Sequence, residues 1–284
     1  MQEAEDKNLM RIFPGRGEHV PLQGLYLSER FGPTGQPSEP FVYANFIASL
    51  DGRISLTEPR TTKRTVPPAT ANVRDRRLFQ ELAACADALV TSGRYVRDLP
   101  HGVTARSFPV SGKPEYADLL QWRRMRGLRP QPAVAIVTAS LDLPPLDALA
   151  KSGRSVYVAT GGAADPRKIT RVESQGVRVL RVGDGTRVAG RRLIEALGRE
   201  AHWNIAMLGG GEVLHTLIVD DVLDRLYLTL ACRMLGGLSF DTLLTGPALE
   251  PAARFRLKAL HYDAEAPDGS DIEQLLAILD RWRS

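Results

Sequence analysis

The sequence predicts an α/β protein of three layers, with helices on both faces of a mostly parallel, mixed sheet and antiparallel strands near the C-terminus. Three observations lead to this fold class. Short apolar runs alternate with segments of helical periodicity through the centre of the 284-residue chain, an order typical of a parallel sheet. Several of these runs end in a glycine-containing turn. The runs at residues 226–230 and 254–262 have no helix between them, so we expect antiparallel edges there.

The first 40 residues differ from the rest of the chain. They are rich in glycine and proline and show little periodicity, so we expect an irregular N-terminal arm over residues 1–40. Within this arm, only residues 24–27 are candidates for a short helix or strand. The body, residues 41–284, is expected to form one domain.

The elements of the body follow from apolar periodicity and from turn residues. The expected strands are residues 41–48, 88–90, 133–138, 155–159, 177–182, 204–208, 226–230 and 254–262. The expected helices are residues 72–85, 116–125, 145–150, 169–175 and 191–200, a helix beginning at residue 211, and residues 272–282. Residues 58–69 are expected to form a loop, and the long connection at residues 95–132 suggests a lid or a partner contact.

Composition narrows the function classes. The chain is 43% hydrophobic, and its 37 basic and 33 acidic residues give a net charge of +4. This scattered excess suits an anionic small molecule and does not argue for nucleic acid. Only two cysteines, Cys85 and Cys232, are present, both in apolar surroundings, which fits a reducing compartment. Residues 1–10 are acidic and polar, and no run approaches ~18 apolar residues. We therefore expect no membrane contact and a cytoplasmic location.

The chain is organised around residues 203–237. A buried strand is expected at residues 204–208, three glycines follow at 209–211, and a helix starts with Glu212 in its first turn. A strand, a glycine turn and a helix start together form a geometry that binds anions, because free backbone N–H groups point at one spot. The alternative is a tight turn packed for its own sake. The pattern is not the dinucleotide fingerprint G-x-G-x-x-G, because Leu214 occupies the place of the last glycine.

Several turns follow the strands of the predicted parallel sheet. They are residues 49–52, 91–94, 160–162, 183–185 and 209–212. Parallel strands end at one edge of a sheet, so these turns are expected to converge on one crevice, where open α/β sheets bind ligands. Such a groove suits a ligand with separated phosphates. Thr91 and Arg94 are candidates to reach a phosphate, and the alternative for Arg94 is a surface arginine.

The sequence contains no nucleophilic triad, metal-ligand set or P-loop signature, so no metal is expected. Its five histidines are dispersed. His215, on the helix after the glycines, is interpreted as a packed or surface residue. A dinucleotide groove without acid–base residues points to hydride transfer, because the cofactor then supplies the chemistry.

Motifs in three regions carry a resemblance to a known family. They are FIASLDGRIS at residues 46–55, ADALVTSGR at 86–94 with Asp98 and Pro100 behind it, and the glycine stretch with the later VDD and GG motifs at 219–221 and 236–237. From about Phe41 to the C-terminus the chain resembles the pyrimidine reductase domain of riboflavin biosynthesis. The resemblance implies the dihydrofolate-reductase-like fold and makes residues 41–284 a reductase domain.

The resemblance also implies an activity and a set of contacts. The activity is NADPH-dependent reduction of a ribosylamino-pyrimidine 5′-phosphate at the ribosyl C1′, usually by a homodimer. The implied cofactor contacts are Ile47, Ala48, Tyr95, Asp98, Gly209, Gly210, Gly211, Glu212, Val213 and Leu214. The run Thr91, Ser92, Gly93 and Arg94 is similar to the Gly-Arg corner by which dihydrofolate reductases hold cofactor phosphate, and Arg94 favours NADPH over NADH.

Two further site residues complete the prediction. Thr160 and Gly161 join the cofactor site through the position of their turn at the shared sheet edge. Asp51 is the candidate for contacting substrate or donating a proton, and the alternative is a structural turn aspartate. Proton donation would require a raised pKa at this carboxyl.

The chain departs from the family pattern at two places, which leaves the substrate open. Residues 209–212 read Gly-Gly-Gly-Glu where the riboflavin enzymes commonly have Glu-Gly-Gly-Pro, and Ala83 stands where they often have an arginine for substrate phosphate. One alternative is therefore a dihydrofolate or pteridine reductase on the same fold. Another is a non-catalytic dinucleotide-binding module, suggested by the missing general acid and by the long 95–132 connection.

Overall fold

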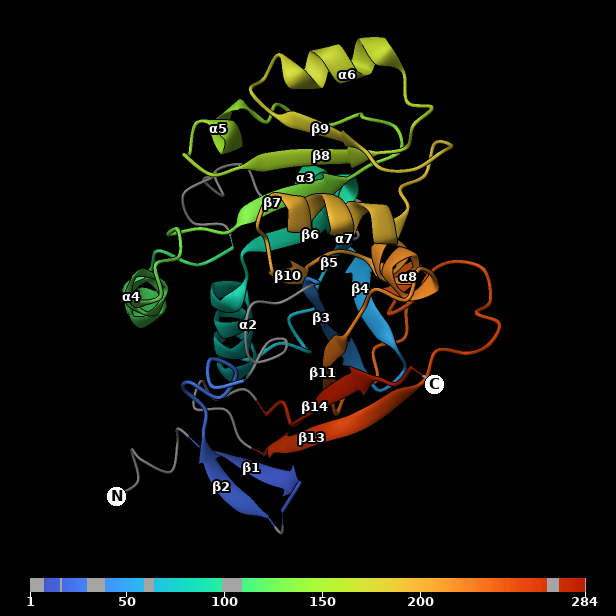
Figure 1. Cartoon of the computed structure of the whole chain (residues 1–284). Helices are drawn as coiled ribbons and strands as arrows, with labels where there is room; N and C mark the ends of the chain where they lie inside the picture. The colour runs from blue at the N-terminus through green and yellow to red at the C-terminus, as the bar shows by residue number, and fades with distance from the viewer. Residues whose placement is uncertain are drawn as a thin grey trace.

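A computed structural model describes residues 8–15, 17–29, 39–58, 64–98, 109–264 and 271–283. Most of the strands in these residues form one twisted sheet with the order β2-β1-β13-β14-β11-β3-β10-β6-β7-β8-β9 (Figure 1). No helix in the described part of the chain is long and apolar enough to cross a membrane.

The parallel half of the sheet confirms the predicted parallel core, and it also includes the run at 226–230, which was expected at an antiparallel edge. It consists of β11 (Arg225–Ala231), β3 (Phe41–Ser49), β10 (Asn204–Met207), β6 (Ala88–Ser92), β7 (Ala133–Val137), β8 (Val156–Thr160) and β9 (Arg178–Arg181). Because all of these strands run in one direction, their carboxyl ends lie along one edge of the sheet.

Helices cover both faces of this half, as the three-layer prediction requires. On one face lie α2 (Val73–Cys85), α3 (Gly93–Asp98), α5 (Asp147–Ala150) and α6 (Pro166–Glu173), with α4 (Ala117–Met125) packed on α2. On the other face lie α7 (Gly190–Arg199) and α8 (Gly211–Val219). Helix α2 begins where its sequence indicates, because the Asn72 side chain accepts hydrogen bonds from the Arg74 and Asp75 amides.

The antiparallel half corrects one prediction. Residues 272–282 were expected to be helical, but they contain the strand β14 (Gln274–Arg281), which pairs with β11 and with β13 (Phe255–Asp263). The apolar residues of β14 face both sides of the sheet. Leu276 and Ile278 belong to the core on the α2 side, and Leu279 packs against the core on the other side. A strand covered on both faces is apolar at almost every position, so its spacing also fits a helix.

The N-terminal arm is more regular than predicted. Strands β1 (Asn8–Phe13) and β2 (Glu18–Pro21) form a hairpin, and β1 pairs with β13, so the sheet continues into the arm. The stretch at 24–27 is a turn, and its Gly24 and Tyr26 amides donate to the buried Glu81 carboxylate of α2 at 2.7 and 3.0 Å. Residues 1–7, 16 and 30–38 lie outside the described residues.

A second, three-stranded sheet lies beside the carboxyl edge. It has the order β12 (Phe240–Thr242), β4 (Arg53–Thr57) and β5 (Arg64–Thr65). Strand β4 follows the predicted turn at 49–52, while β5 interrupts the loop predicted for 58–69. The described part of the 95–132 connection contains most of α3 and all of α4.

Candidate active site

A cavity of about 540 Å³ opens at the carboxyl edge of the parallel strands. Its walls come from α2, from the ends of β3, β6 and β10, and from the small sheet. The lining residues are Asn45, Phe46, Ile47, Ile54, Ser55, Arg64, Thr65, Val66, Pro68, Ala71, Asp75, Arg76, Phe79, Ser92, Arg94, Tyr95, Leu208, Gly209, Gly210 and Asp241. Its size and its mixture of apolar walls with a few polar groups suit a small organic ligand.

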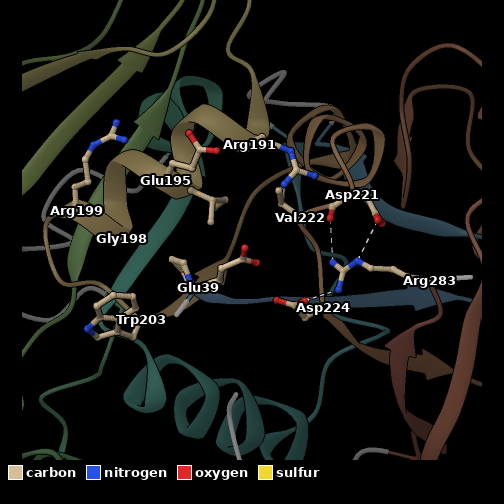
Figure 2. Close-up of a pocket in the computed structure, with 12 residues that line it drawn as sticks. Glu39, Arg191, Glu195, Gly198, Arg199, Trp203, Asp221, Val222, Asp224 and Arg283 are labelled. Atoms are coloured by element: carbon tan, nitrogen blue, oxygen red, sulfur yellow. Dashed lines mark hydrogen bonds and ion pairs between the residues drawn. The ribbon is translucent and has the colours of Figure 1, made fainter. Parts of the chain in front are cut away.

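A larger cavity, of about 710 Å³, lies near the amino end of β3 (Figure 2). In its wall, Arg283 donates to Asp224 at 2.8 Å and to Asp221 at 3.1 Å. None of the predicted site residues lines it. We therefore take the smaller cavity as the candidate site, because ligands of open α/β sheets bind at the carboxyl ends of the strands.

The glycine triplet divides between two roles. Gly209 and Gly210, two of the predicted cofactor contacts, line the cavity. A side chain at Gly211 would meet the Thr242 carbonyl oxygen and the Thr245 nitrogen at 2.8 and 2.9 Å, so this glycine is required by packing. The next three predicted cofactor contacts, at residues 212–214, do not line the cavity. Glu212 is exposed outside the lining, while Val213 and Leu214 are buried in the core.

The residues at the end of β6 and in α3 also divide between lining and packing roles. Ser92, Arg94 and Tyr95 line the cavity. Thr91 is fully buried and its hydroxyl donates to the Leu208 carbonyl at 2.7 Å, so it ties β6 to β10 and does not face a ligand. Gly93 allows a close approach instead, because a Cβ there would lie 3.0 Å from Leu143 and 3.2 Å from Thr138. Asp98 ends α3, and its side chain lies outside the described residues.

Asp51 does not have the environment of a proton donor. Its carboxylate accepts hydrogen bonds from the Ser49 hydroxyl and from the Gly236 amide, the latter at 2.8 Å, and it pairs with Arg53 at 2.7 Å. These contacts, the Ser49 hydrogen bond first, lower its pKa to about 2. Asp51 also lies outside the cavity lining. The structure therefore supports the alternative, a turn aspartate that joins 49–53 to the loop after β11.

On β3, only one of the two predicted residues reaches the cavity. Ile47 lines it, whereas Ala48 is 3% exposed and belongs to the core under α8. This difference follows from strand geometry, since successive side chains point to opposite faces of the sheet.

The turn after β8 is not part of the cavity. A side chain at Gly161 would overlap the Gly185 carbonyl oxygen, 2.1 Å away, and Thr160 is fully buried. Here the glycines at 161–162 let two loops, after β8 and after β9, pack on each other. The predicted cofactor contacts at Thr160 and Gly161 are therefore not among the residues that the structure gathers.

Helix α2 supplies a residue that the sequence analysis missed. Asp75 lines the cavity and is only 9% exposed, with a hydrogen bond from the Thr229 hydroxyl of β11. Burial raises the pKa of this carboxyl to about 6. Its neighbours in the wall are the adjacent Arg76 and, one turn along the same helix, Phe79. An acidic group in a cleft with a displaced pKa is a functional candidate.

Ala83, where the resemblance implied a phosphate-binding arginine, is not among the residues that line the cavity. It is fully buried in a small cluster with Val110 and Leu119 of the α4 region. Arg76 of α2 instead lines the cavity. Because residue 83 does not line the cavity, the lack of an arginine at this position does not change the set of charged groups in the cavity wall.

A charged network at the cavity mouth was also missed. The Asp241 carboxylate of β12 accepts hydrogen bonds from Arg64 at 2.8 Å, from Arg94 at 2.9 Å and from the Ser55 hydroxyl at 2.7 Å. No local pattern in the sequence indicates this arrangement, because the four residues come from four separate segments. Among the residues that the structure describes, no group of three or more His, Cys, Asp or Glu side chains is placed to hold a metal ion.

Comparison with known proteins decides the family. The profile described as the RibD C-terminal domain matches residues 40–266. The chain belongs to the RibD C-terminal domain family. This assignment confirms the resemblance found in the sequence motifs.

Individual relatives agree with this family. A 2,5-diamino-6-ribosylamino-4(3H)-pyrimidinone 5′-phosphate reductase of Archaeoglobus fulgidus is 26% identical over 208 residues, which cover 73% of this chain and 87% of the relative. A pyrimidine reductase-like protein of Corynebacterium diphtheriae superposes with a TM-score of 0.63 at 17% identity, covering 86% of this chain and 93% of the other. The riboflavin biosynthesis reductase of Saccharomyces superposes with a TM-score of 0.55 at 17% identity, covering 88% of this chain and 93% of the other. These structures share the fold of this RibD-type domain.

Proposed function

We propose that the protein is a pyrimidine reductase of riboflavin biosynthesis that uses NADPH to reduce the ribosyl C1′ of a ribosylamino-pyrimidine 5′-phosphate. Membership of the RibD C-terminal domain family and the reductase activity for which the archaeal relative is named support a reductase of this kind. The observation that carries the proposal is the cavity, which is lined both by the glycine turn after β10 and by an acidic and a basic residue of α2.

The glycine side of the cavity fits the coenzyme. Gly209 and Gly210 line this side without side chains, and the Arg94 guanidinium lies close to Gly210, 3.1 Å from where a Cβ would be. Ile47 and Tyr95 add apolar surface at the same end. A bound reduced nicotinamide supplies the hydride. The chain's own residues hold and orient the two ligands, which is the protein's usual share in cofactor chemistry.

The α2 side fits the phosphorylated substrate. The Asp75 carboxyl can accept hydrogen bonds from the N–H groups of a pyrimidine edge, and below its pKa of about 6 it can also donate one. Phe79 offers apolar surface beside it, and Arg76 offers a guanidinium for the 5′-phosphate. Asp75 replaces Asp51 as our candidate for contact with substrate.

Steady-state oxidation of NADPH tests this assignment. We expect turnover with the ribosylamino-pyrimidine 5′-phosphate, and we expect Arg76→Gln to raise its KM about ten- to a hundredfold, because a hydrogen bond to a charged group contributes about 1.5–3 kcal/mol. The KM for NADPH should remain near the wild-type value. Arg124→Gln, at an exposed arginine of α4, is the matched control. Indifference to the compound at high enzyme concentration would exclude this substrate.

The same assay decides between the alternatives. A dihydropterin or dihydrofolate presents a similar amino-pyrimidinone edge to Asp75, so turnover with these compounds would move the assignment to a pteridine reductase. Turnover with any substrate would exclude the non-catalytic module. We also propose that the protein prefers NADPH over NADH, forms a homodimer and is located in the cytoplasm.

A further inference from the structure

We propose that Asp241 occupies a phosphate subsite at the mouth of the cavity, and that a phosphate group of a bound ligand displaces it. Two guanidiniums from separate elements, Arg64 of β5 and Arg94 of α3, converge on this one carboxylate. The inference deepens the proposed function, since that function requires both a phosphorylated coenzyme and a phosphorylated substrate.

The two arginines are placed for an anion that enters from the cavity. Both line it, as does Asp241, and their side chains remain 28% and 47% exposed, whereas that of Asp241 is 16% exposed. A phosphate can therefore reach the guanidiniums directly. Paired guanidiniums suit a phosphate because each offers several donors in a planar fork.

The position of Arg94 links this pair to the glycine turn. One of its terminal nitrogens lies 2.9 Å from Asp241 and 3.1 Å from where a Cβ of Gly210 would be. The guanidinium thus packs against the glycine turn that lines the cavity. The chain after Asp241 continues over the same turn, since Thr242 and Thr245 contact Gly211.

Charge and exposure explain why a phosphate would displace the carboxylate. Each pair is partly exposed, and such ion pairs contribute only about 0.2–1 kcal/mol. A phosphate monoester carries up to two negative charges and more acceptor oxygens than the carboxylate it replaces. Asp241 therefore holds Arg64 and Arg94 in place in the free protein and lowers the affinity of the subsite for phosphate.

Equilibrium binding of three probes to the full chain tests the inference. The probes are NADP⁺, NAD⁺ and ribose 5-phosphate, measured by calorimetry at low salt, with adenosine as the probe without phosphate. Asp241→Asn should bind at least one phosphate-bearing probe about three- to tenfold more tightly than the wild type does, and adenosine should bind unchanged. Tighter binding of NADP⁺ alone would assign the subsite to the 2′-phosphate of the coenzyme. Tighter binding of both NADP⁺ and NAD⁺ would assign it to the coenzyme diphosphate. Tighter binding of ribose 5-phosphate would assign it to the phosphate of the substrate.

Control variants separate displacement from general charge or folding effects. Asp147→Asn removes an equal charge from the exposed Asp147–Lys151 pair on α5 and should change nothing. Asp241→Glu keeps the charge and should bind as the wild type does. Asp241→Ser gives a second neutral variant if the asparagine variant unfolds at a lower temperature. Unchanged or weaker binding of all three phosphate-bearing probes to the neutral variants would overturn the inference. Because binding needs no turnover, a failure of the proposed reaction would be visible separately.

Discussion

Replacing Asp75 with asparagine should make the protein more stable and less active. The carboxyl is 9% exposed, and its pKa rises from 3.8 to about 6, mainly because burial disfavours the charged form. A displacement of this size corresponds to about 3 kcal/mol at neutral pH, where the group is ionised in both the folded and the unfolded chain. Asparagine is neutral, has a similar shape and can still accept the Thr229 hydrogen bond. Asp75→Asn should therefore raise the free energy of unfolding by up to about 3 kcal/mol at pH 7.

The pH dependence identifies the cause. Because the folded pKa lies above the unfolded one, the wild type loses stability from this group as the pH rises from about 4 through 6. The difference between Asp75→Asn and the wild type should thus shrink to about 1.5 kcal/mol at pH 5 and approach zero below pH 4. Urea unfolding at pH 4, 5 and 7 measures this difference. In the reductase assay, kcat/KM should fall at least tenfold, because the substrate loses a charged hydrogen-bond partner.

Two results would refute the reasoning. If the asparagine variant were no more stable than the wild type at pH 7, Asp75 would not be a buried, costly carboxylate. If the stability gain were the same at pH 4 and pH 7, it would not arise from titration of this group. If the variant were more stable and fully active, Asp75 would still be a buried, costly carboxylate, but it would not contact the substrate.

Further expectations concern other parts of the molecule. Asp51→Asn should lower the free energy of unfolding, because the pKa of Asp51 in the folded protein, about 2, lies below the usual value. In urea unfolding, the wild type should therefore be more stable than the variant above pH 4, and this difference should disappear as the pH falls toward 2. Gly161→Ala should lower the free energy of unfolding by about 3 kcal/mol or more, because its Cβ would overlap the Gly185 carbonyl, yet coenzyme affinity of the folded fraction should not change. In the native protein a thiol reagent should label the exposed Cys232 and not the buried Cys85, whose pKa is raised by burial; labelling of both without denaturant would contradict the described core.

Much of the fold was predictable because most elements carry their own signals. Helical spacing over residues 72–85 predicts α2, and the short apolar runs predict the parallel strands. The strand β14 was mistaken for a helix because its position in the middle of the sheet decides its conformation. Neither the pairing with β11 nor the core on both of its faces can be seen in residues 272–282 alone.

The site was less predictable because it depends on contacts between distant segments. An aspartate three residues after a helix cap, such as Asp75, usually serves the helix dipole. Its functional character comes from desolvation in the cavity and from Thr229, which is more than 150 residues away in sequence. Asp241 is similar, since nothing near it in sequence indicates that Arg64 and Arg94 will meet at its carboxylate.

The glycine turns show which step of the sequence argument was too broad. All of the predicted turns lie after parallel strands, so the shared edge was correctly predicted, but a shared edge is longer than one ligand site. Neighbouring strands lie about 4.8 Å apart, which puts the end of β8 roughly 10 Å beyond that of β6. At that distance Gly161 and Gly162 have another loop to contact, and their missing side chains serve its backbone. Gly209 and Gly210 end a strand in the middle of the sheet beside α2, where the elements leave open space. A glycine after a parallel strand can therefore serve either a ligand site or a packing contact. Which of the two it serves depends on the segment that lies opposite it, and only the tertiary structure determines that segment.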